Sequence, residues 1–219
     1  MRGLIKYFLI IFFIANASSQ DKLFTIIDPD QTGIHFSNDL IDTKENNVFL
    51  YANFYGGAGV GVGDFDNDGL DDLFFAGNLV DDKIYKNLGN LKFQDKTPNS
   101  GIINDSSWST GVTVADVNND GLLDIYVSCE LYDDQPKLRT NKLYINKGNF
   151  EFDELAAKWN VDVDRRTRHA VFFDYNKDGL LDLYLLNHPP NTGNFSPFLG
   201  TDMKLPEYNL QLFENKEGF

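Results

Sequence analysis

Three short acidic segments of the chain have the residue types and the spacing that a hard cation needs. They share Asp at position 1, Asp or Asn at position 3, Asp at position 5, Gly at position 6, Leu at position 7 and Asp at position 9, and they lie at 64–72, 116–124 and 174–182. Oxygen ligands on alternate residues, followed by a glycine that permits a sharp turn, suit Ca²⁺. The residue at position 7 can add a backbone carbonyl, because that role does not depend on its side chain. We therefore predict a calcium loop in each segment.

An EF-hand begins in the same way, but position 12 and the flanking residues exclude it. An EF-hand loop has a bidentate Glu at position 12, whereas this chain has Phe75, Val127 and Leu185 there. Both flanks of each loop are short β-branched and aromatic runs, which are typical of buried strands. Each unit is therefore strand, loop, strand. The alternative that stays open is a hairpin turn without metal, since Asp, Asn and Gly favour turns in any case.

A longer repeat surrounds each loop and predicts the fold class. A further pair of short strands with a polar Asn/Gly turn follows each loop, at 83–95, 142–153 and 212–219. Each repeat thus contains four strands, and a period of about 50 to 60 residues with four strands is typical of a propeller blade. The sequence predicts an all-β chain with three blades, at about 48–97, 108–156 and 167–219.

Residues 23–36 predict one more strand near the start of the mature chain. The segment 24–28 resembles the outer strand of the first repeat at 93–97, and a Gly-Ile pair follows each of them, at Gly33 and Gly101. In a closed propeller such a strand completes the last blade. The similarity therefore predicts a closing strand whose sheet partners lie elsewhere in the sequence.

Three repeats are too few for a closed ring. A propeller has about 4 to 8 blades, and the third repeat stops at Phe219, where its outer strand should begin. We expect a partial β-propeller of about three four-stranded blades, which is the N-terminal part of a longer protein or a truncated reading frame, with residues 23–36 as an unpaired closing strand. The alternative is a self-contained small β-domain in which this strand completes the third blade.

The first residues predict export. A basic start, an apolar run at 7–14 and the small-residue site Ala15-Asn16-Ala17 form a secretory signal peptide at 1–17, cleaved after Ala17. The mature chain, residues 18–219, is then secreted or held at the cell surface. The apolar run is too short to span a bilayer, and no later stretch is longer and equally apolar, so we expect no membrane span after cleavage.

The net charge excludes one class of partner, and the cysteine content excludes an intramolecular disulfide. The formal net charge is −14, and removal of Arg2 and Lys6 with the signal peptide makes the mature chain more acidic still. Such a chain repels nucleic acid, so no nucleic-acid partner is expected. Cys129 is the only cysteine, so an intramolecular disulfide is impossible and metal sites can take over its stapling role. We expect Cys129 itself to be a buried apolar residue.

Three other features carry weaker predictions. Alternating glycines at 57–63 leave one strand face almost without side chains, which predicts close backbone approach near a propeller axis. A nucleotide-binding glycine loop is the alternative, but it would need a helix after the glycines and none follows. The basic cluster at 165–169 predicts a salt-bridged surface, with contact to an acidic ligand as the alternative. The insertion at 186–210 is either a binding loop or a connector. The scattered histidines have no metal-ligand partners at useful spacing, so a zinc site is not expected.

The repeated unit resembles a known family. The segment GVGDFDNDGLDDL at 61–73 and its two counterparts are similar to FG-GAP/VCBS repeats, which form integrin-α-like β-propellers with calcium between the first two strands of a blade. The segments 33–36 and 55–64 are similar to the start of CRTAC-type (cartilage acidic protein-like) bacterial proteins, which often carry a C-terminal ASPIC/UnbV domain. The chain departs from that family in length, with fewer blades and no ASPIC/UnbV region.

The resemblance implies a ligand set for about three Ca²⁺ ions. Carried over by position, side-chain ligands stand at positions 1, 3, 5 and 9 of each loop and a carbonyl ligand at position 7. The implied ligands are Asp64, Asp66, Asp68, Leu70 and Asp72 in the first loop, Asp116, Asn118, Asp120, Leu122 and Asp124 in the second, and Asp174, Asn176, Asp178, Leu180 and Asp182 in the third.

The predicted function is binding rather than catalysis. The sequence shows no nucleophile elbow and no identifiable Ser/His/Asp set. We therefore expect an exported, calcium-stabilised propeller module that binds an extracellular protein or glycan, and no enzyme activity. The alternatives are a fragment of a polysaccharide-active propeller enzyme and a structural spacer of a larger surface protein. Adhesion rests on analogy at the level of the fold alone.

Overall fold

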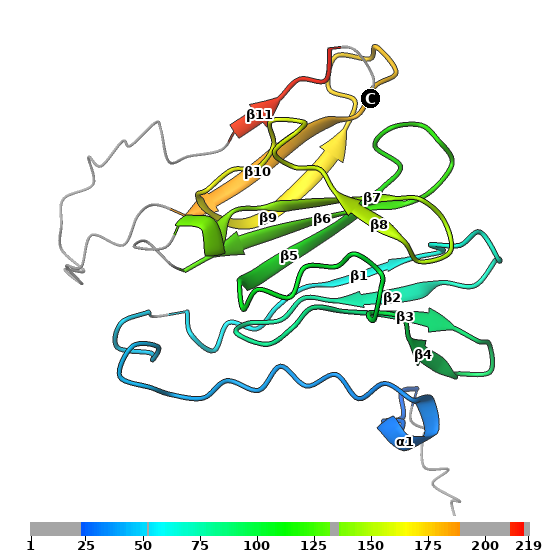
Figure 1. The fold of residues 1–219 in the computed structure, drawn as a ribbon, viewed down its shortest axis with the longest axis vertical. Coiled ribbons are helices and arrows are strands. Elements are labelled where there is room, and N and C mark those ends of the chain that lie inside the picture. Colours follow the sequence, from blue (N-terminus) through cyan, green and yellow to red (C-terminus); the bar gives the residue numbers. More distant parts are fainter. Residues whose placement is uncertain (1–22, 52, 132–135, 189–210, 217–219) are drawn as a thin grey trace, which may run out of the picture.

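The computed structural model describes residues 23–51, 53–131, 136–188 and 211–216. The predicted signal peptide at 1–17 and most of the predicted insertion at 186–210 lie outside the described residues. The described part is almost entirely β-structure, with eleven strands, one helical turn α1 (Pro29–Thr32) and one 3-10 turn η1 (Pro136–Arg139) (Figure 1). The all-β prediction is confirmed.

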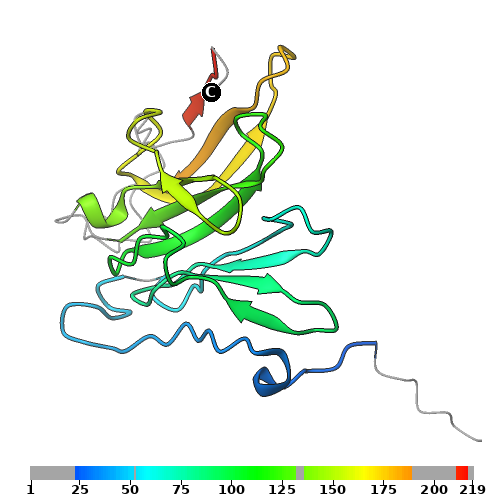
Figure 2. The same ribbon diagram turned by 45° about the vertical axis from the view of Figure 1, so that its right-hand side comes forward.

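The strands form three antiparallel sheets, each built from consecutive strands. The first sheet has the order β1 (Val60–Gly63), β2 (Asp72–Phe75), β3 (Lys83–Asn87) and β4 (Phe93–Asp95). The second has the order β5 (Trp108–Ala115), β6 (Asp124–Glu130), β7 (Lys142–Asn146) and β8 (Phe152–Glu154). The third has the order β9 (Arg166–Phe173), β10 (Asp182–His188) and β11 (Gln211–Phe213). Figure 2 shows the three sheets side by side in sequence order.

Each acidic segment joins the first two strands of its sheet, as the sequence predicts. We call these segments loop 1 (64–72), loop 2 (116–124) and loop 3 (174–182). The strands pair up to the loop, because the last residue of the first strand lies opposite the Asp at position 9 in all three sheets. The glycine at position 6 has φ of 88°, 87° and 90° in the three loops. This left-handed conformation explains why a glycine stands there each time.

The first strands of the three sheets lie beside one another, and glycines allow the approach. A Cβ on Gly59 would lie 2.7 Å from the Thr110 carbonyl oxygen, and a Cβ on Gly61 would lie 2.7 Å from Val112 Cγ1. Between β5 and β9, a Cβ on Gly111 would lie 2.6 Å from the Arg168 carbonyl oxygen. The predicted crowding of the glycine-rich strand against neighbouring backbone is confirmed.

Two apolar clusters fill the spaces between adjacent sheets. Between the first and second sheets lie Phe65, Phe74 and Ile84 together with Ile125, Tyr144 and Phe152. Between the second and third lie Tyr126 and Leu143 together with Ala170, Leu183 and Leu185. Cys129 on β6 is fully buried in the first cluster, as predicted. Each sheet is thus held by its neighbours along the row.

Within the segment 23–36, predicted as an unpaired closing strand, residues 29–32 form the helical turn α1. The helical turn α1 interrupts it, because the Asp28 carboxylate accepts a hydrogen bond from the amide of Asp30 at 2.9 Å and Pro29 begins the turn. Residues 23–28 belong to no described sheet. A strand needs a hydrogen-bonded neighbour, and this segment has none among the described residues. It lies at the end of the row near β4, far from β11 (Figure 1), so it does not complete the third sheet.

The basic cluster at 165–169 contains an ion pair, as predicted, and the acidic partner in that pair is buried. Arg168 pairs with Glu130, whose side chain is 1% exposed, and Tyr51 donates a hydrogen bond to the same carboxylate. Burial and the neighbouring Glu130 charge hold the pKa of Tyr51 well above its ordinary value. The Arg168 side chain therefore links β9 to β6 and to the segment before β1.

Within the described residues, no helix is long and apolar enough to cross a membrane.

Candidate metal centre

The Asp at position 1 folds each loop back on itself. In all three loops its carboxylate accepts hydrogen bonds from the backbone amides at positions 5 and 6. The donor–acceptor distances are 3.0 and 2.7 Å for Asp64, 3.1 and 2.9 Å for Asp116, and 3.1 and 2.9 Å for Asp174. A short acceptor side chain is needed because the donors lie only four and five residues away along the chain.

The Asp at position 5 continues the same pattern. Its Oδ1 atom accepts a hydrogen bond from the amide at position 7, at 3.0 Å for Asp68, 2.8 Å for Asp120 and 2.9 Å for Asp178. These bonds orient the amides of the three leucines that carry the predicted carbonyl ligands, Leu70, Leu122 and Leu180. The carbonyl role of these leucines stays a prediction.

Position 3 separates loop 1 from the other two. In loops 2 and 3 the amide nitrogens of Asn118 and Asn176 each donate to the carboxylate at position 5, at 2.8 Å. In loop 1 the residue at position 3 is Asp66, and Lys86 on β3 pairs with both Asp66 and Asp68. The second of these ion pairs spans 2.7 Å. Compared with loops 2 and 3, loop 1 therefore has one more carboxylate, and the Lys86 ammonium of β3 lies against it.

The Asp at position 9 is the best-buried member of each loop. Asp72, Asp124 and Asp182 are no more than 1% exposed. One oxygen accepts from the amide at position 2 of the same loop, at 2.9, 3.0 and 3.1 Å. The other accepts from the amide of an asparagine at the end of the third strand of the sheet, or two residues after it in the third sheet, at 2.7, 2.8 and 2.8 Å. The three asparagines are Asn87, Asn146 and Asn215.

These asparagines belong to the site, although the sequence analysis did not single them out. The side chain of each one donates to the carbonyl at position 8 of its loop, at 2.8 Å from Asn87, 3.0 Å from Asn146 and 3.4 Å from Asn215. The signal in the sequence is the Asn that recurs in each hairpin after the loops. That the three asparagines occupy equivalent positions becomes clear only when the three hairpins are aligned.

Neighbouring loops are also joined directly. Asn146 of the second sheet donates a further hydrogen bond to the carbonyl of Phe65 in loop 1, at 2.8 Å. Asn67 in loop 1 donates to the carbonyl of Gly121 in loop 2, at 3.0 Å. Loops 1 and 2 therefore share hydrogen bonds as well as apolar contacts.

Burial raises the pKa of the position-9 carboxyls of loops 1 and 2. For Asp124 it raises the pKa to about 6, against the opposing effect of the hydrogen bonds from the amides of Asn146 and Val117. Burial also raises the pKa of Asp72, where the ammonium of Lys86 acts in the opposite direction. A buried carboxylate with only amide partners is costly to ionise, and a nearby cation would offset that cost.

The geometry of loop 1 fits a calcium ion. Oxygen atoms of Asp64, Asp66 and Asp72 lie within 4.8 Å of one another. Calcium–oxygen distances of about 2.3–2.6 Å place ligands on opposite sides of one ion about 5 Å apart, so one ion can reach all three. Moreover, Asp66 Oδ1 is buried and has no hydrogen-bond partner, while Lys86 binds the Oδ2 atom. Such an orphan oxygen suits a ligand role.

Comparison with known proteins agrees with this architecture. Residues 64–127 match the model of the family described as FG-GAP-like repeat, a range that runs from the start of loop 1 into β6. Cartilage acidic protein 1 of Xenopus tropicalis is 26% identical over 179 residues, which cover 80% of this chain. The match spans 27% of that relative's length. The resemblance drawn from the sequence is thus confirmed: residues 64–127 are similar to FG-GAP-like repeats, and the chain is distantly similar to cartilage acidic protein 1.

Proposed function

We propose that this chain is an exported, non-catalytic repeat module whose acidic loops bind calcium and whose surface binds an extracellular protein or glycan. The observation that carries the calcium part is the cluster of three carboxylates in loop 1, with the unpartnered Asp66 Oδ1 among them. The three sheets act as consecutive blades of a partial β-propeller. The FG-GAP-like match supports a binding module rather than an enzyme.

Calcium would act on the fold through the chain's own carboxylates. The ligands at positions 1, 3 and 5 lie in the loop and the ligand at position 9 begins the second strand, so a cation that binds them ties the loop to that strand. Bound calcium supplies positive charge that offsets the repulsion among these carboxylates. The position-9 carboxylate extends this link to the third strand, because it already accepts the amide hydrogen of the strand-end asparagine.

The first test is a thermal melt in millimolar calcium and in chelator, with two variants in the same loop. Asp66→Ala removes a predicted ligand, and Asp71→Ala removes an exposed carboxylate at position 8 that is outside the predicted ligand set. We expect calcium to raise the melting temperature of the parent and of Asp71→Ala, and to raise that of Asp66→Ala less, because ligand binding stabilises only the folded state. An identical calcium response in the two variants would contradict the proposal for loop 1.

The partner class needs a separate test. The acidic net charge of −14 and the relationship to a protein named for cartilage and acidity favour a partner in the extracellular matrix. We expect saturable, calcium-dependent binding of the purified chain to at least one member of an immobilised panel of matrix proteins and glycans. No saturable binding across the panel would favour the spacer alternative. Steady release of sugar ends from the polysaccharides would favour the enzyme alternative.

A further inference from the structure

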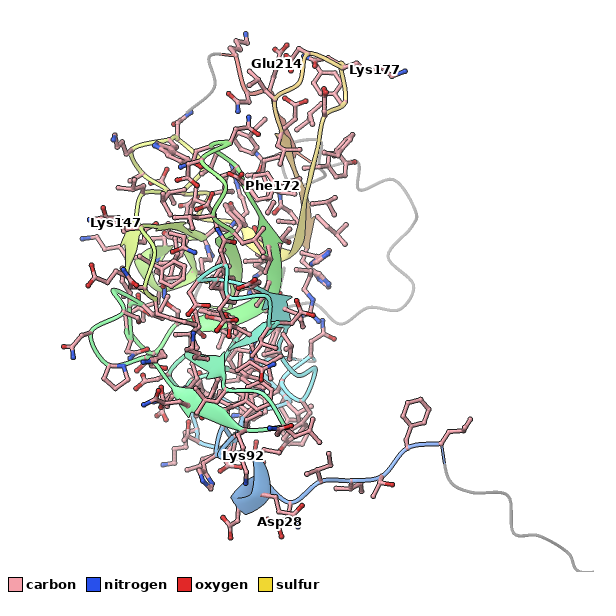
Figure 3. All side chains as sticks on the ribbon, turned by 90° about the vertical axis from the view of Figure 1, so that its right-hand side faces the viewer. Asp28, Lys92, Lys147, Phe172, Lys177 and Glu214 are labelled. Carbon is pink, nitrogen blue, oxygen red and sulfur yellow. The ribbon has the colours of Figure 1, made fainter. Side chains whose placement is uncertain are left out.

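A cluster of charged side chains is buried between the first and second sheets, at the end of these sheets opposite loops 1 and 2. We call this space the first interface, and the space between the second and third sheets the second interface. Asp82 precedes β3, Lys142 begins β7, and Asp105 lies in the connector before β5. Asp82 and Lys142 are only 4% and 6% exposed, whereas lysines such as Lys147 and Lys177 point outward from the molecule (Figure 3). Buried charges are costly, so this cluster needs partners within the protein.

The Asp82 carboxylate joins the two sheets through neutral donors. Its Oδ1 atom accepts a hydrogen bond from the amide of Gly77, which follows β2, at 2.8 Å, and its Oδ2 atom accepts from the hydroxyl of Ser109 on β5, at 3.1 Å. The cavity lined by Asp82, Ser109 and Lys142 leaves no space for a water molecule. The charge of Asp82 is therefore offset by protein groups rather than by solvent.

Lys142 is neutralised by a different carboxylate. Its ammonium donates to Asp105 at 2.8 Å and to the Ser107 hydroxyl at 3.1 Å. Ser107 in turn donates to Asp105, through its amide at 3.1 Å and through its hydroxyl. Burial acts against both charges, but the neighbouring groups hold the pKa of Asp105 below and that of Lys142 above the ordinary value. Lys142 and Asp105 thus form a charge-balanced pair, and Asp82 is a second carboxylate beside it.

The other titratable groups around Asp82 do not balance its charge. Cys129 on β6 and Tyr144 on β7 interact with it electrostatically. Burial raises the pKa of Cys129 to about 12 and that of Tyr144 well above its ordinary value, so both stay neutral at physiological pH. Asp81 also lines the cavity, but it is exposed to solvent and acidic. Among the described residues, the cluster therefore has two carboxylates for one ammonium, and one negative charge in excess.

The equivalent place at the second interface has a neutral side chain. Asn141 precedes β7 as Asp82 precedes β3. Its side chain accepts a hydrogen bond from the amide of Cys129 at 2.8 Å and donates to the hydroxyl of Thr167 on β9 at 2.9 Å. These two bonds are the counterparts of the two bonds that Asp82 makes. An amide thus bridges the second interface in the same way without a charge.

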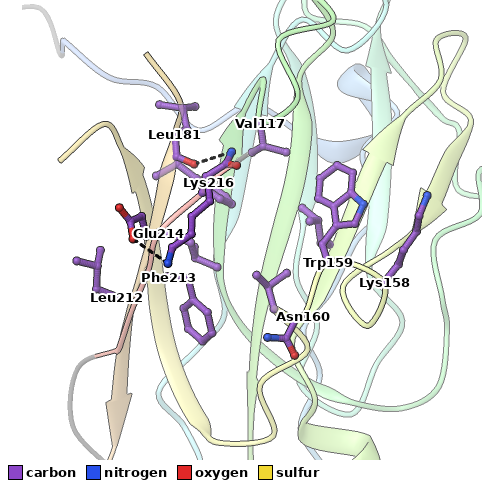
Figure 4. Close-up of a pocket in the computed structure, with 14 residues that line it drawn as sticks. Val117, Lys158, Trp159, Asn160, Leu181, Leu212, Phe213, Glu214 and Lys216 are labelled. Carbon is purple, nitrogen blue, oxygen red and sulfur yellow. Dashed lines mark hydrogen bonds and ion pairs between the residues drawn. The ribbon is translucent and has the colours of Figure 1, made fainter. Parts of the chain in front are cut away.

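The partner of the bridging side chain changes together with it. Lys142 lies opposite the fourth residue of β6, and Gln211 lies opposite the fourth residue of β10. A carboxylate and an ammonium at the first interface therefore correspond to two neutral amides at the second. Figure 4 shows an ion pair near the second interface, but this pair of Lys216 with Glu214, at 3.6 Å, is exposed to solvent. The fold does not require a charged bridge, so the charge of Asp82 must have another explanation.

We propose that Asp82 is a proton-binding site that tightens the first interface when the pH falls from about 8 to about 5. The proton binds Oδ2, because Oδ1 accepts from the amide of Gly77. The Ser109 hydroxyl turns to accept that proton, since a hydroxyl can donate or accept. Binding of one proton removes the excess negative charge and leaves Lys142 paired with Asp105.

The direction of the effect follows from burial. Burial raises the pKa of Asp82 to about 6, although the charge of Lys142 and the hydrogen bond from Gly77 oppose this shift. The ordinary value of 3.8 applies to the unfolded chain, so the folded state binds the proton more tightly and gains stability as the pH falls. Because Asp82 lies outside the acidic loops, this inference can fail or succeed independently of calcium binding.

The test is urea unfolding in chelator, at about pH 7.5 and about pH 5, for the parent, Asp82→Asn and the control Asp81→Asn. Asp82→Asn gives the first interface the side chain of the second, and Asp81→Asn removes a neighbouring exposed carboxylate. On acidification we expect the folding equilibrium constant to rise about tenfold more for the parent and the control than for Asp82→Asn. The carboxyls of the loops are the same in all three proteins, so their titration cancels in the comparison. Equal pH dependence in the parent and in Asp82→Asn overturns the proposal.

Hydrogen exchange tests whether the effect reaches the contact between the sheets. The amide of Ser109 donates to the carbonyl of Gly77 across the first interface at 3.0 Å. On acidification the protection of this amide should rise more in the parent than in Asp82→Asn. The same change in both proteins contradicts a role of Asp82 in tightening the interface.

A titration of the parent needs no variant and stays decisive if Asp82→Asn does not fold. The carboxyl carbon resonance of Asp82, assigned by sequential connectivity in the labelled parent, should titrate with a pKa of about 6. A pKa at or below the ordinary value of 3.8 overturns the proposal.

Discussion

Loops 1 and 2 share one backbone design but balance their charge by different routes. In loop 1, Asp66 holds position 3 and the ammonium of Lys86 pairs with it and with Asp68. In loop 2, the neutral Asn118 holds position 3, and Ile145 stands directly before the strand-end asparagine, where the first sheet has Lys86. One extra carboxylate is thus offset by one extra ammonium, and the two sets of predicted ligands have equal net charge with their neighbour included.

The difference teaches that the charge of a loop is set jointly by position 3 and by the residue before the strand-end asparagine. Hydrogen bonds to Asp66 and then to Asp68 hold the pKa of Lys86 well above its ordinary value, so it stays charged at neutral pH. The hydrogen bond from Lys86 in turn lowers the pKa of Asp68. Since ligand charge count tunes calcium affinity, Lys86 should moderate the affinity of loop 1.

The largest effect is expected where the two loops are alike, at position 9. Asp124→Ala leaves the buried amides of Val117 and Asn146 without acceptors. Each buried donor left unpaired costs about 1–3 kcal/mol, so we expect the free energy of unfolding to fall by about 2–6 kcal/mol for the two donors. Urea unfolding in chelator measures it. Asp153→Ala, in an exposed ion pair with Lys147, is the control and should change little.

A pH dependence of stability tests the burial of Asp124, the position-9 residue of loop 2. The folded-state pKa of Asp124 is raised to about 6 from an ordinary value of 3.8, so the folded state binds the proton more tightly than the unfolded state. In chelator, its contribution to the free energy of unfolding should therefore rise by roughly 2 kcal/mol as the pH falls from 7 towards 4.

The measurement is urea unfolding at several pH values for the parent and for Asp124→Asn, which cannot titrate. The difference between the two pH slopes isolates the Asp124 contribution. In calcium the slope difference should reverse, because a cation favours the ionised carboxylate. Equal slopes for the two proteins in chelator would show that burial of Asp124 does not perturb its ionisation.

Lys86→Ile breaks the balance in loop 1 by giving it the residue of loop 2. The extra carboxylate then lacks its ammonium partner, so we expect loop 1 to bind calcium about tenfold more tightly and the chelated protein to melt at a lower temperature. Isothermal titration measures the affinity. Lys83→Ile, on the same strand and in an exposed pair with Asp95, is the matched control. Unchanged affinity in Lys86→Ile would mean that the ammonium does not act on the site.

The smallest effect is expected when both changes are made together. The double variant Asp66→Asn with Lys86→Ile gives loop 1 the composition of loop 2 at both places. Its calcium affinity should lie within about threefold of the parent, whereas Asp66→Asn alone should weaken binding by about tenfold. A double-mutant cycle by titration tests this. A double variant whose calcium affinity differs from that of the parent by about tenfold or more would refute the equivalence of the two loops.

The sequence was sufficient for features that depend on neighbouring residues. The turn glycine Gly69, the strands on both sides of each loop and the close approach at Gly59 follow from local composition and alternation. These features are predictable because the hydrogen bonds and steric limits involved act within one hairpin or on one bare backbone. The position-1 and position-5 carboxylates likewise bond within their own loop.

Features that join distant residues could not be read in the same way. Lys86 reaches loop 1 only because β3 pairs with β2, and Asn146 bonds to Phe65 only because two sheets lie together. The segment 23–36 has the sequence of a strand but contains the turn α1 at 29–32, and a strand needs a neighbour that its own sequence does not supply. The sequence pattern also could not predict that Arg168 pairs with the buried Glu130.

The hydrogen bonds from Asn67 to Gly121 and from Asn146 to Phe65 would couple ligand binding at loop 1 to ligand binding at loop 2. A ligand that orders loop 2 also orders the Gly121 carbonyl, which accepts from Asn67 of loop 1. It also orders Asn146, which donates to the Phe65 carbonyl of loop 1. By linkage, if calcium binds both loops as proposed, each loop changes the calcium affinity of the other by the same free energy. Disruption of loop 1 should then alter the calcium affinity of loop 2, and disruption of loop 2 should alter that of loop 1.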